Sequence, residues 1–145
     1  MKLSKKSEYG LRALIELTLA YEDHTTLQRH HIAKRQHIPI EFLEQILLAL
    51  KRAGLLASRR GLKGGYTLIK PPGEITVGQV IRILDGPLAP IGCVSKTAYQ
   101  KCRDCPYADK ALCPVQHVMG PVRDAIAGIL DNCTLNDFAS SHRKG

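Results

Sequence analysis

The sequence predicts a mainly helical protein with a small β wing: a winged helix-turn-helix, followed by a cysteine-rich cluster loop and a C-terminal dimerisation helix. Apolar residues recur at helical spacing through the first 53 residues, and a basic glycine-rich segment follows them. Four of the five cysteines then lie between residues 93 and 113. The prolines and glycine of KPPG, residues 70–73, impose a turn that divides the chain into residues 1–70 and residues 71–145.

Three helices are expected before the wing. Residues 7–21 form an amphipathic helix whose apolar side carries Leu11, Leu14, Ile15 and Thr18. A shorter helix over residues 28–36 ends before Pro39, because proline disfavours helical backbone in the residue that precedes it. Pro39 then opens a third helix, which Gly54 ends. This third helix covers residues 40–53, and its expected inner side holds Phe42, Leu43, Ile46, Leu47 and Leu50.

Two short strands are expected over residues 55–59 and 66–69, since the glycines of GLKGG between them permit a hairpin turn. This order of elements is that of a winged helix-turn-helix. The third helix exposes long polar side chains that can reach base edges in a major groove, namely Glu41, Glu44 and Gln45. The hairpin exposes cations suited to phosphate or minor-groove contact, namely Arg59, Arg60 and Lys63.

The distribution of charge supports binding to double-stranded DNA. The net charge is +8, and residues 1–70 hold thirteen Lys and Arg against six Asp and Glu, a net charge of +7. A basic face can be merely a solvated surface, and Arg59 and Arg60 can simply protect an edge strand from aggregation. Basic charge, helix order and wing coincide in residues 1–70, which favours a DNA-binding domain there.

The second part of the chain contains two further amphipathic segments. Residues 76–86 are expected to form a helix with a capping box at Thr76 and Gln79. After the cysteine loop, residues Val122, Ile126, Ile129 and Leu130 form an apolar stripe. A winged-helix domain closes its own core, so this helix is expected to pack against a second copy in a homodimer, with packing on its own domain as the alternative. Gly120 and Pro121 are expected to interrupt or kink its start.

The four clustered cysteines are spaced C-x8-C-x2-C-x7-C, at Cys93, Cys102, Cys105 and Cys113. Thiolates are soft metal ligands, and iron-sulfur clusters accept irregular loops, so the spacing favours one iron-sulfur centre. Zinc is the main rival. A thiol-exchange site is disfavoured because CRDC does not follow a buried strand at a helix start. The fifth cysteine, Cys133, is expected to act as a small buried hydrophobe.

The sequence also indicates where in the cell the protein is located. No apolar run approaches the roughly 18 residues that a membrane span needs, and Glu8, Arg12 and Glu16 interrupt the apolar stretch that a signal peptide would require. A cytoplasmic protein without membrane association is therefore expected, and in a reducing compartment clustered thiols indicate metal or redox chemistry. The last six residues, SSHRKG, are expected to be disordered.

Three stretches resemble the Rrf2 family of winged-helix transcriptional regulators, many of which carry an iron-sulfur cluster. They are MKLSKKSEYGLRALIEL, IPIEFLEQILLALKRAGLLASRRGLKGGYTLIKPP and ITVGQVIRILDGPLAPIGC. The resemblance implies a homodimeric regulator, not an enzyme, that binds a palindromic operator. It also implies a cluster in the dimerisation region that adjusts DNA affinity in response to iron, redox state or nitric oxide.

The resemblance also implies roles for individual residues. Glu41, Glu44 and Gln45 fall on base-reading positions, and Arg60 matches the minor-groove arginine of the wing. Cys93 and Cys113 match the outer cluster ligands, while Cys105 and Cys102 compete for the central place. In the nitric-oxide sensors of the family, an acidic residue at the place of Glu8 completes the cluster across the dimer interface. Glu8 is thus one candidate for the fourth ligand and Cys102 the other, although Glu8 also suits a simple first-turn acid.

The type of cluster, 2Fe-2S or 4Fe-4S, stays open because the loop is longer than the family pattern. The histidine that follows the last cysteine by three positions in the cluster-assembly regulators is replaced by Gln116, so His117 is not taken as a ligand. Two other functions remain as alternatives. A zinc-dependent structural repressor would be colourless, and a thiol or iron-sulfur redox protein would show turnover with an electron donor and need no wing.

Overall fold

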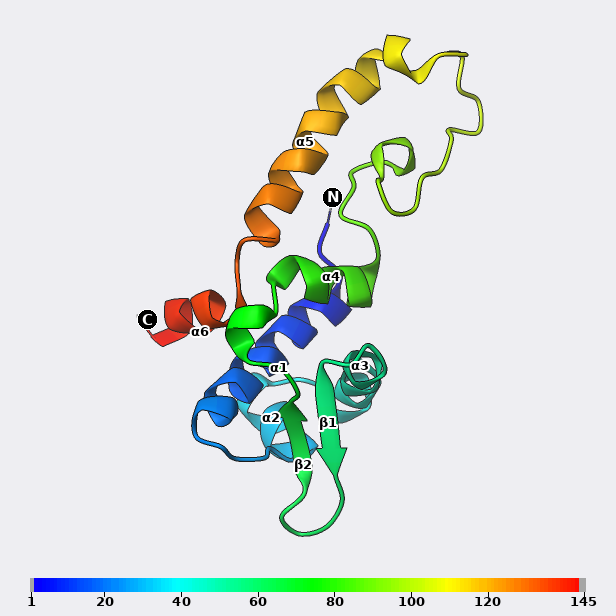
Figure 1. The fold of residues 1–145 in the computed structure, drawn as a ribbon. Coiled ribbons are helices and arrows are strands. Elements are labelled where there is room, and N and C mark those ends of the chain that lie inside the picture. The colour runs from blue at the N-terminus through cyan, green and yellow to red at the C-terminus, as the bar shows by residue number, and fades with distance from the viewer. Residues whose placement is uncertain (1, 144–145) are drawn as a thin grey trace.

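The computed structural model describes residues 2–143 and confirms a mainly helical winged-helix chain with one two-stranded sheet among those residues (Figure 1). The main elements are α1 Lys5–Glu22, α2 Arg29–Gln36, α3 Ile40–Arg52, β1 Leu56–Arg59, β2 Gly65–Leu68, α4 Val77–Asp85, α5 Pro114–Leu130 and α6 Leu135–Arg143. Short 3-10 turns cover Pro72–Glu74, Gly92–Val94 and Lys110–Leu112. In residues 2–143, no helix has the length and apolar character needed to cross a membrane.

Helix α1 is the centre of the core. The side chain of Ser4 caps its start by accepting a hydrogen bond from the amide of Ser7 at 3.1 Å. Nine of its residues are buried, among them Leu14 and Leu17. A Cβ atom at Gly10 would overlap Leu84 of α4 and lie 3.4 Å from a side-chain carbon of Ile46 in α3. The missing side chain at Gly10 therefore lets α1 approach α3 and α4 closely.

The turn between α2 and α3 is set by His37 and Pro39. His37 ends α2 in the left-handed conformation, with φ 52°, and Pro39 precedes the first turn of α3. The inner side of α3 buries four of the predicted residues, Leu43, Ile46, Leu47 and Leu50. The prediction for Phe42 is wrong, since 45% of its surface is exposed. Its ring instead packs edge-on against Tyr9, with ring centroids 5.8 Å apart, at the rim of the core.

The wing is the antiparallel pair of β1 and β2, in a register that sets Leu56 opposite Leu68. It is joined to the segment before α2, because the backbones of Leu27 and Tyr66 exchange hydrogen bonds of 3.1 and 2.7 Å. Gly65, with φ 139°, lies so close to the backbone of Leu27 that a side chain would collide with it. The wing therefore packs on the helical body as part of the same domain.

The end of the chain returns to α1. The N-cap predicted at Thr76 is present, since its hydroxyl accepts from the amide of Gln79 at 3.1 Å, and the predicted box at Thr134 is complete, since Thr134 and Asp137 bond reciprocally at 2.9 and 3.2 Å. The second cap starts α6, whose Leu135 is buried in the core. The prediction of a disordered tail is wrong for residues 140–143, which continue this capped helix, and residues 144–145 lie outside the described residues.

Most of helix α5 projects away from this core, which only its C-terminal part contacts (Figure 1). It begins at Pro114 and continues through Gly120 and Pro121, so the expected interruption at its start is wrong. Pro121 is exposed, which leaves the carbonyl that it cannot bond open to water. No residue of α5 is buried. Its largest exposed apolar side chains, together with Leu112 just before it, are Val115, Val118, Val122 and Ile129.

Candidate nucleic-acid interface and metal centre

A basic groove of about 620 Å³ lies between the start of α2, the end of α3 and the wing. Cationic side chains from all three elements line it, namely Arg29, Lys51, Arg59 and Arg60. Lys51 donates a hydrogen bond of 2.6 Å to the hydroxyl of Ser58, which links α3 to β1. A groove of this charge suits a polyanionic backbone.

The predicted base-reading side chains Glu41, Glu44 and Gln45 are all exposed on α3. Glu44 is held in place by an ion pair of 3.1 Å with Arg29 of α2. Its carboxylate therefore projects between the two helices of the helix-turn-helix, beside the groove. Gln45, the next residue, presents an amide that can both donate and accept hydrogen bonds, as adenine recognition requires.

The wing loop is fastened at its tip. Gln28 donates a hydrogen bond of 3.0 Å to the carbonyl of Leu62, and the hydroxyl of Thr26 donates one of 3.0 Å to the carbonyl of Lys63. The side chains of Arg60 and Lys63 remain exposed. The structure thus brings the predicted wing cations together on a loop whose backbone is already ordered, a feature that sequence reasoning missed.

The four clustered cysteines line one cavity of about 380 Å³ between the loop and the start of α5. The sulfur atoms of Cys93 and Cys102 lie 3.9 Å apart. The thiol of Cys105 donates to the carbonyl of Tyr107 at 3.6 Å, and Cys113 is the N-cap residue of α5. The thiol spacing of the sequence therefore converges on a single site.

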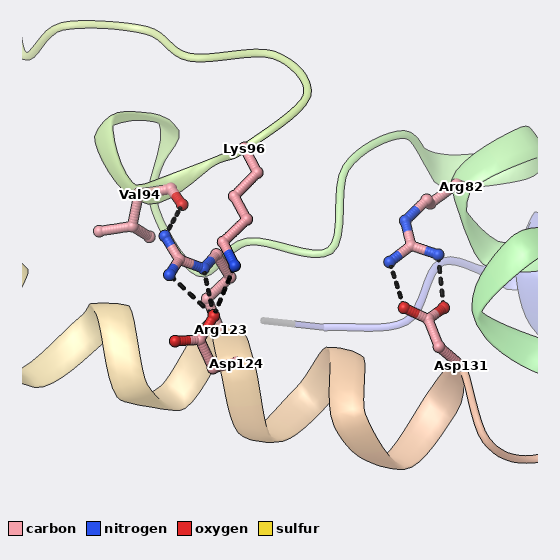
Figure 2. Close-up of polar contacts among 6 residues, drawn as sticks. All are labelled: Arg82, Val94, Lys96, Arg123, Asp124 and Asp131. Carbon is pink, nitrogen blue, oxygen red and sulfur yellow. Dashed lines mark hydrogen bonds and ion pairs between the residues drawn. The ribbon is translucent and has the colours of Figure 1, made fainter.

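Side chains of α5 hold the backbone of the first cysteine. Gln116 donates a hydrogen bond of 2.9 Å to the carbonyl of Cys93, and the guanidinium of Arg123 donates one to the carbonyl of Val94. Arg123 also pairs with Asp124, which accepts a second ion pair from Lys96 at 3.4 Å (Figure 2). Arg123 was not predicted, because no local pattern shows which loop a helix side chain will meet.

The thiols influence one another electrostatically. The pKa of Cys102 is raised above its ordinary value, first by the hydrogen bond to Cys93 and then by the negative charge of the Cys93 thiolate. The charges of Cys105 and Cys113 act in the same direction. Four thiolates around one cavity repel each other, and a bound cation removes that repulsion.

The donor set fits a soft metal centre. Within residues 2–143, no three or more His, Cys, Asp or Glu side chains already stand as they would around a bound ion. The four thiols nevertheless share one cavity, and Cys102 and Cys105 lie on a segment outside any helix or strand, from which thiolates can be brought to a metal. These residues fit an iron-sulfur cluster or a zinc ion.

The remaining candidates lie elsewhere. Glu8 does not line this cavity and forms an ion pair of 3.0 Å with Lys5 in the first turn of α1. Its predicted role concerns the cluster of a partner subunit, so that role stays a prediction. Cys133 packs against the hydrophobic core, as expected. His117 is exposed, and its ring lies 2.5 Å from the carbonyl of Ala111.

Two polar contacts fix α4, one to the end of α5 and one to the start of α1. Arg82 of α4 makes a bidentate pair with Asp131 at the end of α5, with N to O distances of 2.5 and 2.8 Å (Figure 2). The hydrogen bond from Arg82 lowers the pKa of Asp131. Asp85, the last residue of α4, accepts a hydrogen bond of 3.2 Å from the amide of Ser4, at the start of α1.

Comparison with known proteins shows the same architecture elsewhere. The profile of a family described as Rrf2, iron-dependent transcriptional regulator, matches residues 3–141. CymR of Bacillus subtilis, an HTH-type transcriptional regulator, is 34% identical over 140 residues, which cover 97% of this chain and 91% of CymR. IscR of Cronobacter sakazakii, also an HTH-type transcriptional regulator, is 32% identical over 141 residues, which cover 97% of this chain and 82% of IscR.

Solved structures agree with these relatives. The structure of B. subtilis CymR, described as the global cysteine regulator, superposes with a TM-score of 0.79 at 33% identity, covering 97% of this chain and 98% of CymR. The structure of T. potens IscR superposes with a TM-score of 0.76 at 29% identity, covering 98% of this chain and 88% of IscR.

Proposed function

Because the chain belongs to the Rrf2 family of transcriptional regulators, we propose that it is a cytoplasmic, homodimeric regulator that binds a palindromic operator in double-stranded DNA, as a repressor or as an activator. An iron-sulfur cluster in the cysteine loop adjusts its affinity for that operator, and the chain has no enzymatic role. The observation that carries the proposal is the convergence of four thiols on one cavity beside α5, in a chain whose other half is a basic winged helix.

The DNA interface would combine α3 with the wing. Gln45 and Glu41 would face base edges in the major groove, with Glu44 oriented by its ion pair to Arg29. Arg59, Arg60 and Lys63 would contact phosphates or enter the adjacent minor groove. The supporting observations are the exposure of these side chains and the cationic groove between the two elements.

The cluster would be held by Cys93, Cys105 and Cys113, with either Cys102 or Glu8 of the partner subunit as the fourth ligand. When bound, a cluster supplies iron that reacts with oxidants or nitric oxide, which is the chemistry of a sensor. The chain's own residues position the ligands: Gln116 and Arg123 hold the backbone at Cys93, and Cys113 is fixed at the start of α5.

A route from the loop to the DNA interface runs through α4 and α1. The loop leaves α4 directly after Asp85, and Asp85 is bonded to Ser4 at the start of α1. Further along α1, Gly10 lies against both Leu84 of α4 and Ile46 of α3. A change in the loop that pulls on the end of α4 would therefore bear on the helix that supports α3, which is the coupling between two sites that regulation needs.

Dimerisation would use the exposed stripe of α5, made by Val115, Val118, Val122 and Ile129. These residues recur every three to seven positions and share one side of the helix. Two residues of the predicted stripe, Ile126 and Leu130, pack partly against the core of their own chain. The proposed interface therefore begins nearer the cysteine loop than the sequence alone indicated.

The first test is a visible absorption spectrum with iron, sulfide and zinc analysis of protein purified without oxygen. A brown protein containing iron and sulfide supports the proposal. The second candidate is a zinc-dependent structural repressor, since the 3.9 Å between Cys93 and Cys102 suits two thiolates on one zinc ion, for which Zn–S bonds of about 2.3 Å give a similar separation. A colourless protein that contains zinc would establish that candidate instead.

The fourth ligand is tested by comparing Glu8→Ala with Cys102→Ala in the same assay. If Glu8 is the ligand, Glu8→Ala changes the spectrum and the cluster-dependent DNA response, while Cys102→Ala keeps both. The reverse pattern assigns the site to four thiols. DNA binding itself is tested by selecting bound fragments from random-sequence DNA, where a palindromic consensus is expected. Turnover with an electron donor and no selected sequence would indicate a redox protein.

A further inference from the structure

We propose that Cys93 and Cys102 form a reversible intramolecular disulfide whenever the cysteine cavity is free of metal. The two sulfur atoms lie 3.9 Å apart and both line the cavity. The inference deepens the proposed function, because Cys93 is one of the proposed cluster ligands. It holds whether the fourth ligand is Cys102 or Glu8 of the partner subunit, since it concerns the metal-free protein.

The backbone on either side of this pair is already aligned. The amide of Gln100 donates a hydrogen bond of 3.0 Å to the carbonyl of Gly92, one residue before Cys93. A Cβ atom at Gly92 would lie 2.9 Å from the Cβ of Gln100, so only glycine permits this close approach. This hydrogen bond joins the two segments, or arms, of the loop that carry the cysteines: Cys93 directly follows Gly92, and Cys102 is the second residue after Gln100.

One side of the pair is hydrogen-bonded to α5, and on the other side Cys102 lies on an exposed segment. The carbonyls of Cys93 and Val94 accept hydrogen bonds from Gln116 and Arg123, which anchor that arm to α5. The opposite arm, residues 96–102, is exposed throughout. A disulfide needs a sulfur separation of about 2.05 Å, and closing a loop of eight intervening residues costs little chain entropy. Movement of the exposed arm can therefore close the bond.

The other cysteines are less well placed. The Cys105 thiol is directed to the carbonyl of Tyr107 in its own segment, and Cys113 is the N-cap residue of α5. Cys133 packs against the hydrophobic core, outside the cavity. Cys102 is the exposed member of the four, so a small oxidant in solvent can reach its pair with Cys93.

Hydrogen peroxide is a sufficient oxidant. The thiolate of one cysteine attacks a peroxide oxygen and the O–O bond breaks; the departing hydroxide takes up the proton that this thiol had released, which gives a sulfenic acid and one water. The second thiol then attacks that sulfur and the S–O bond breaks, and the departing hydroxide takes the proton of the second thiol to leave as a second water. Two thiols and one peroxide thus give one disulfide and two waters, and a dithiol reductant reverses the reaction.

The disulfide would have two consequences for the regulator. It occupies Cys93, so cluster assembly cannot proceed until the bond is reduced. It also stops oxidation at a reversible stage, whereas an isolated sulfenic acid proceeds to sulfinic and sulfonic acids that thiols do not repair. The disulfide with Cys102 would therefore mark protein that lost its cluster under oxidising conditions. Its reduction would return Cys93 as a thiol that can bind a new cluster.

The sequence makes the linkage simple to map. Trypsin cleaves after Arg82, Lys96, Lys101, Arg103, Lys110 and Arg123, which places each of the four cysteines in a separate peptide. Full-length protein is stripped of metal without oxygen, treated with equimolar hydrogen peroxide, alkylated and digested. The expected major product is the Cys93 peptide joined to the dipeptide that contains Cys102, and it disappears after treatment with dithiothreitol.

Three variants sharpen the test. Cys102→Ser should lose the linked product completely, while Cys105→Ser, the matched control in the next peptide, should keep it. Gly92→Ala retains all four thiols but displaces Gln100, so the yield of linked product should fall. A Cys102–Cys105 or Cys93–Cys113 link as the main product, a disulfide between subunits, or Cys93 recovered as a sulfinic acid would each overturn the inference.

The test separates this inference from the proposed function. If protein purified without oxygen lacks iron and sulfide, yet peroxide joins Cys93 to Cys102, the cluster proposal fails and the disulfide stands. If the cluster is present but its removal yields a protein that peroxide does not link at this pair, the disulfide alone is wrong.

Discussion

Helices α1 and α5 are nearly equal in length, with 18 and 17 residues, but they differ in what covers them. Helix α1 buries nine of its residues within the chain, whereas α5 buries none and leaves a stripe of valine and isoleucine side chains exposed. The winged-helix part is therefore complete as a single chain. The exposed apolar stripe of α5 is the surface that the proposed dimer would cover.

The cysteine loop differs from the wing loop in the same way. The wing loop is fastened by hydrogen bonds from Thr26 and Gln28 to its tip. The cysteine loop is fastened at Cys93 and Val94, while residues 96–104 are exposed. Under the proposed function, the wing loop is ordered before DNA binds and the cysteine loop becomes ordered when the cluster binds, and the following experiments test that difference.

The largest effect is expected from Cys113→Ser. Because Cys113 begins α5 and lines the cavity, its loss should abolish visible cluster absorption and bound iron. Cys133→Ser is the matched control, since this thiol lies against the core outside the cavity, and it should keep full absorption. Equal iron content in the two variants would show that the loop is not completed by a metal.

A second large effect is expected from Val118→Lys, which places a charge in the exposed stripe of α5. Val118 is 60% exposed in one chain, so the substitution should leave the fold intact but convert the dimer to monomers in sedimentation experiments. Gly128→Lys is the control: it adds the same charge on a different side of α5 from the stripe, at a position where an added Cβ atom meets no atom within 4 Å. Monomers from Gly128→Lys, or dimers from Val118→Lys, would place the interface elsewhere.

Substitutions on the DNA face should have intermediate effects, and these should fall on recognition without changing the fold. Gln45→Ala and Arg60→Ala should each weaken operator binding by about 1–3 kcal/mol, with little change on random DNA, because base contacts carry the specificity. Lys63→Ala should weaken binding to both kinds of DNA alike. Titrations at fixed salt with operator and random duplexes distinguish the two outcomes, and unchanged operator binding by both specificity variants would contradict the proposed interface.

The smallest effect is expected from Asp131→Asn, at the joint between the two regions. Arg82 lowers the pKa of Asp131, so the pair stabilises the fold above the unfolded pKa of about 3.9 and loses that contribution as the pH falls through the lower folded pKa. The pair is partly exposed, which limits its contribution to about 1 kcal/mol or less. Thermal melts of metal-free protein should separate wild type from variant at pH 7, and the difference should shrink as the pH falls below the unfolded pKa of about 3.9.

Much of the winged helix could be predicted because its signals are local. Apolar spacing identified α1 and α3, and the N-caps predicted at Thr76 and Thr134 were both correct. The error at Phe42 arose because helical spacing does not distinguish a core side chain from one at the rim. The tail was misjudged because its polar composition concealed a helix that the preceding cap starts and Leu135 anchors.

The cysteine site was less accessible to sequence reasoning. The thiols themselves are conspicuous, but the roles of Gln116 and Arg123 depend on which carbonyls the returning loop brings to α5, and no periodic pattern reports that. The extent of the dimer stripe was likewise uncertain, because Ile126 and Ile129 look equivalent in sequence. Only the placement of α5 beside the core shows that Ile126 is partly buried and that Ile129 is exposed.

The fastened wing has a consequence for the thermodynamics of DNA binding. Hydrogen bonds from Thr26 and Gln28 order the wing tip before any DNA arrives, so the conformational entropy of that loop is lost during folding instead of during association. Binding should then lack the large heat-capacity change that accompanies the ordering of a disordered arm. The binding enthalpy would then change little with temperature, so a van't Hoff plot of operator affinity should be close to linear.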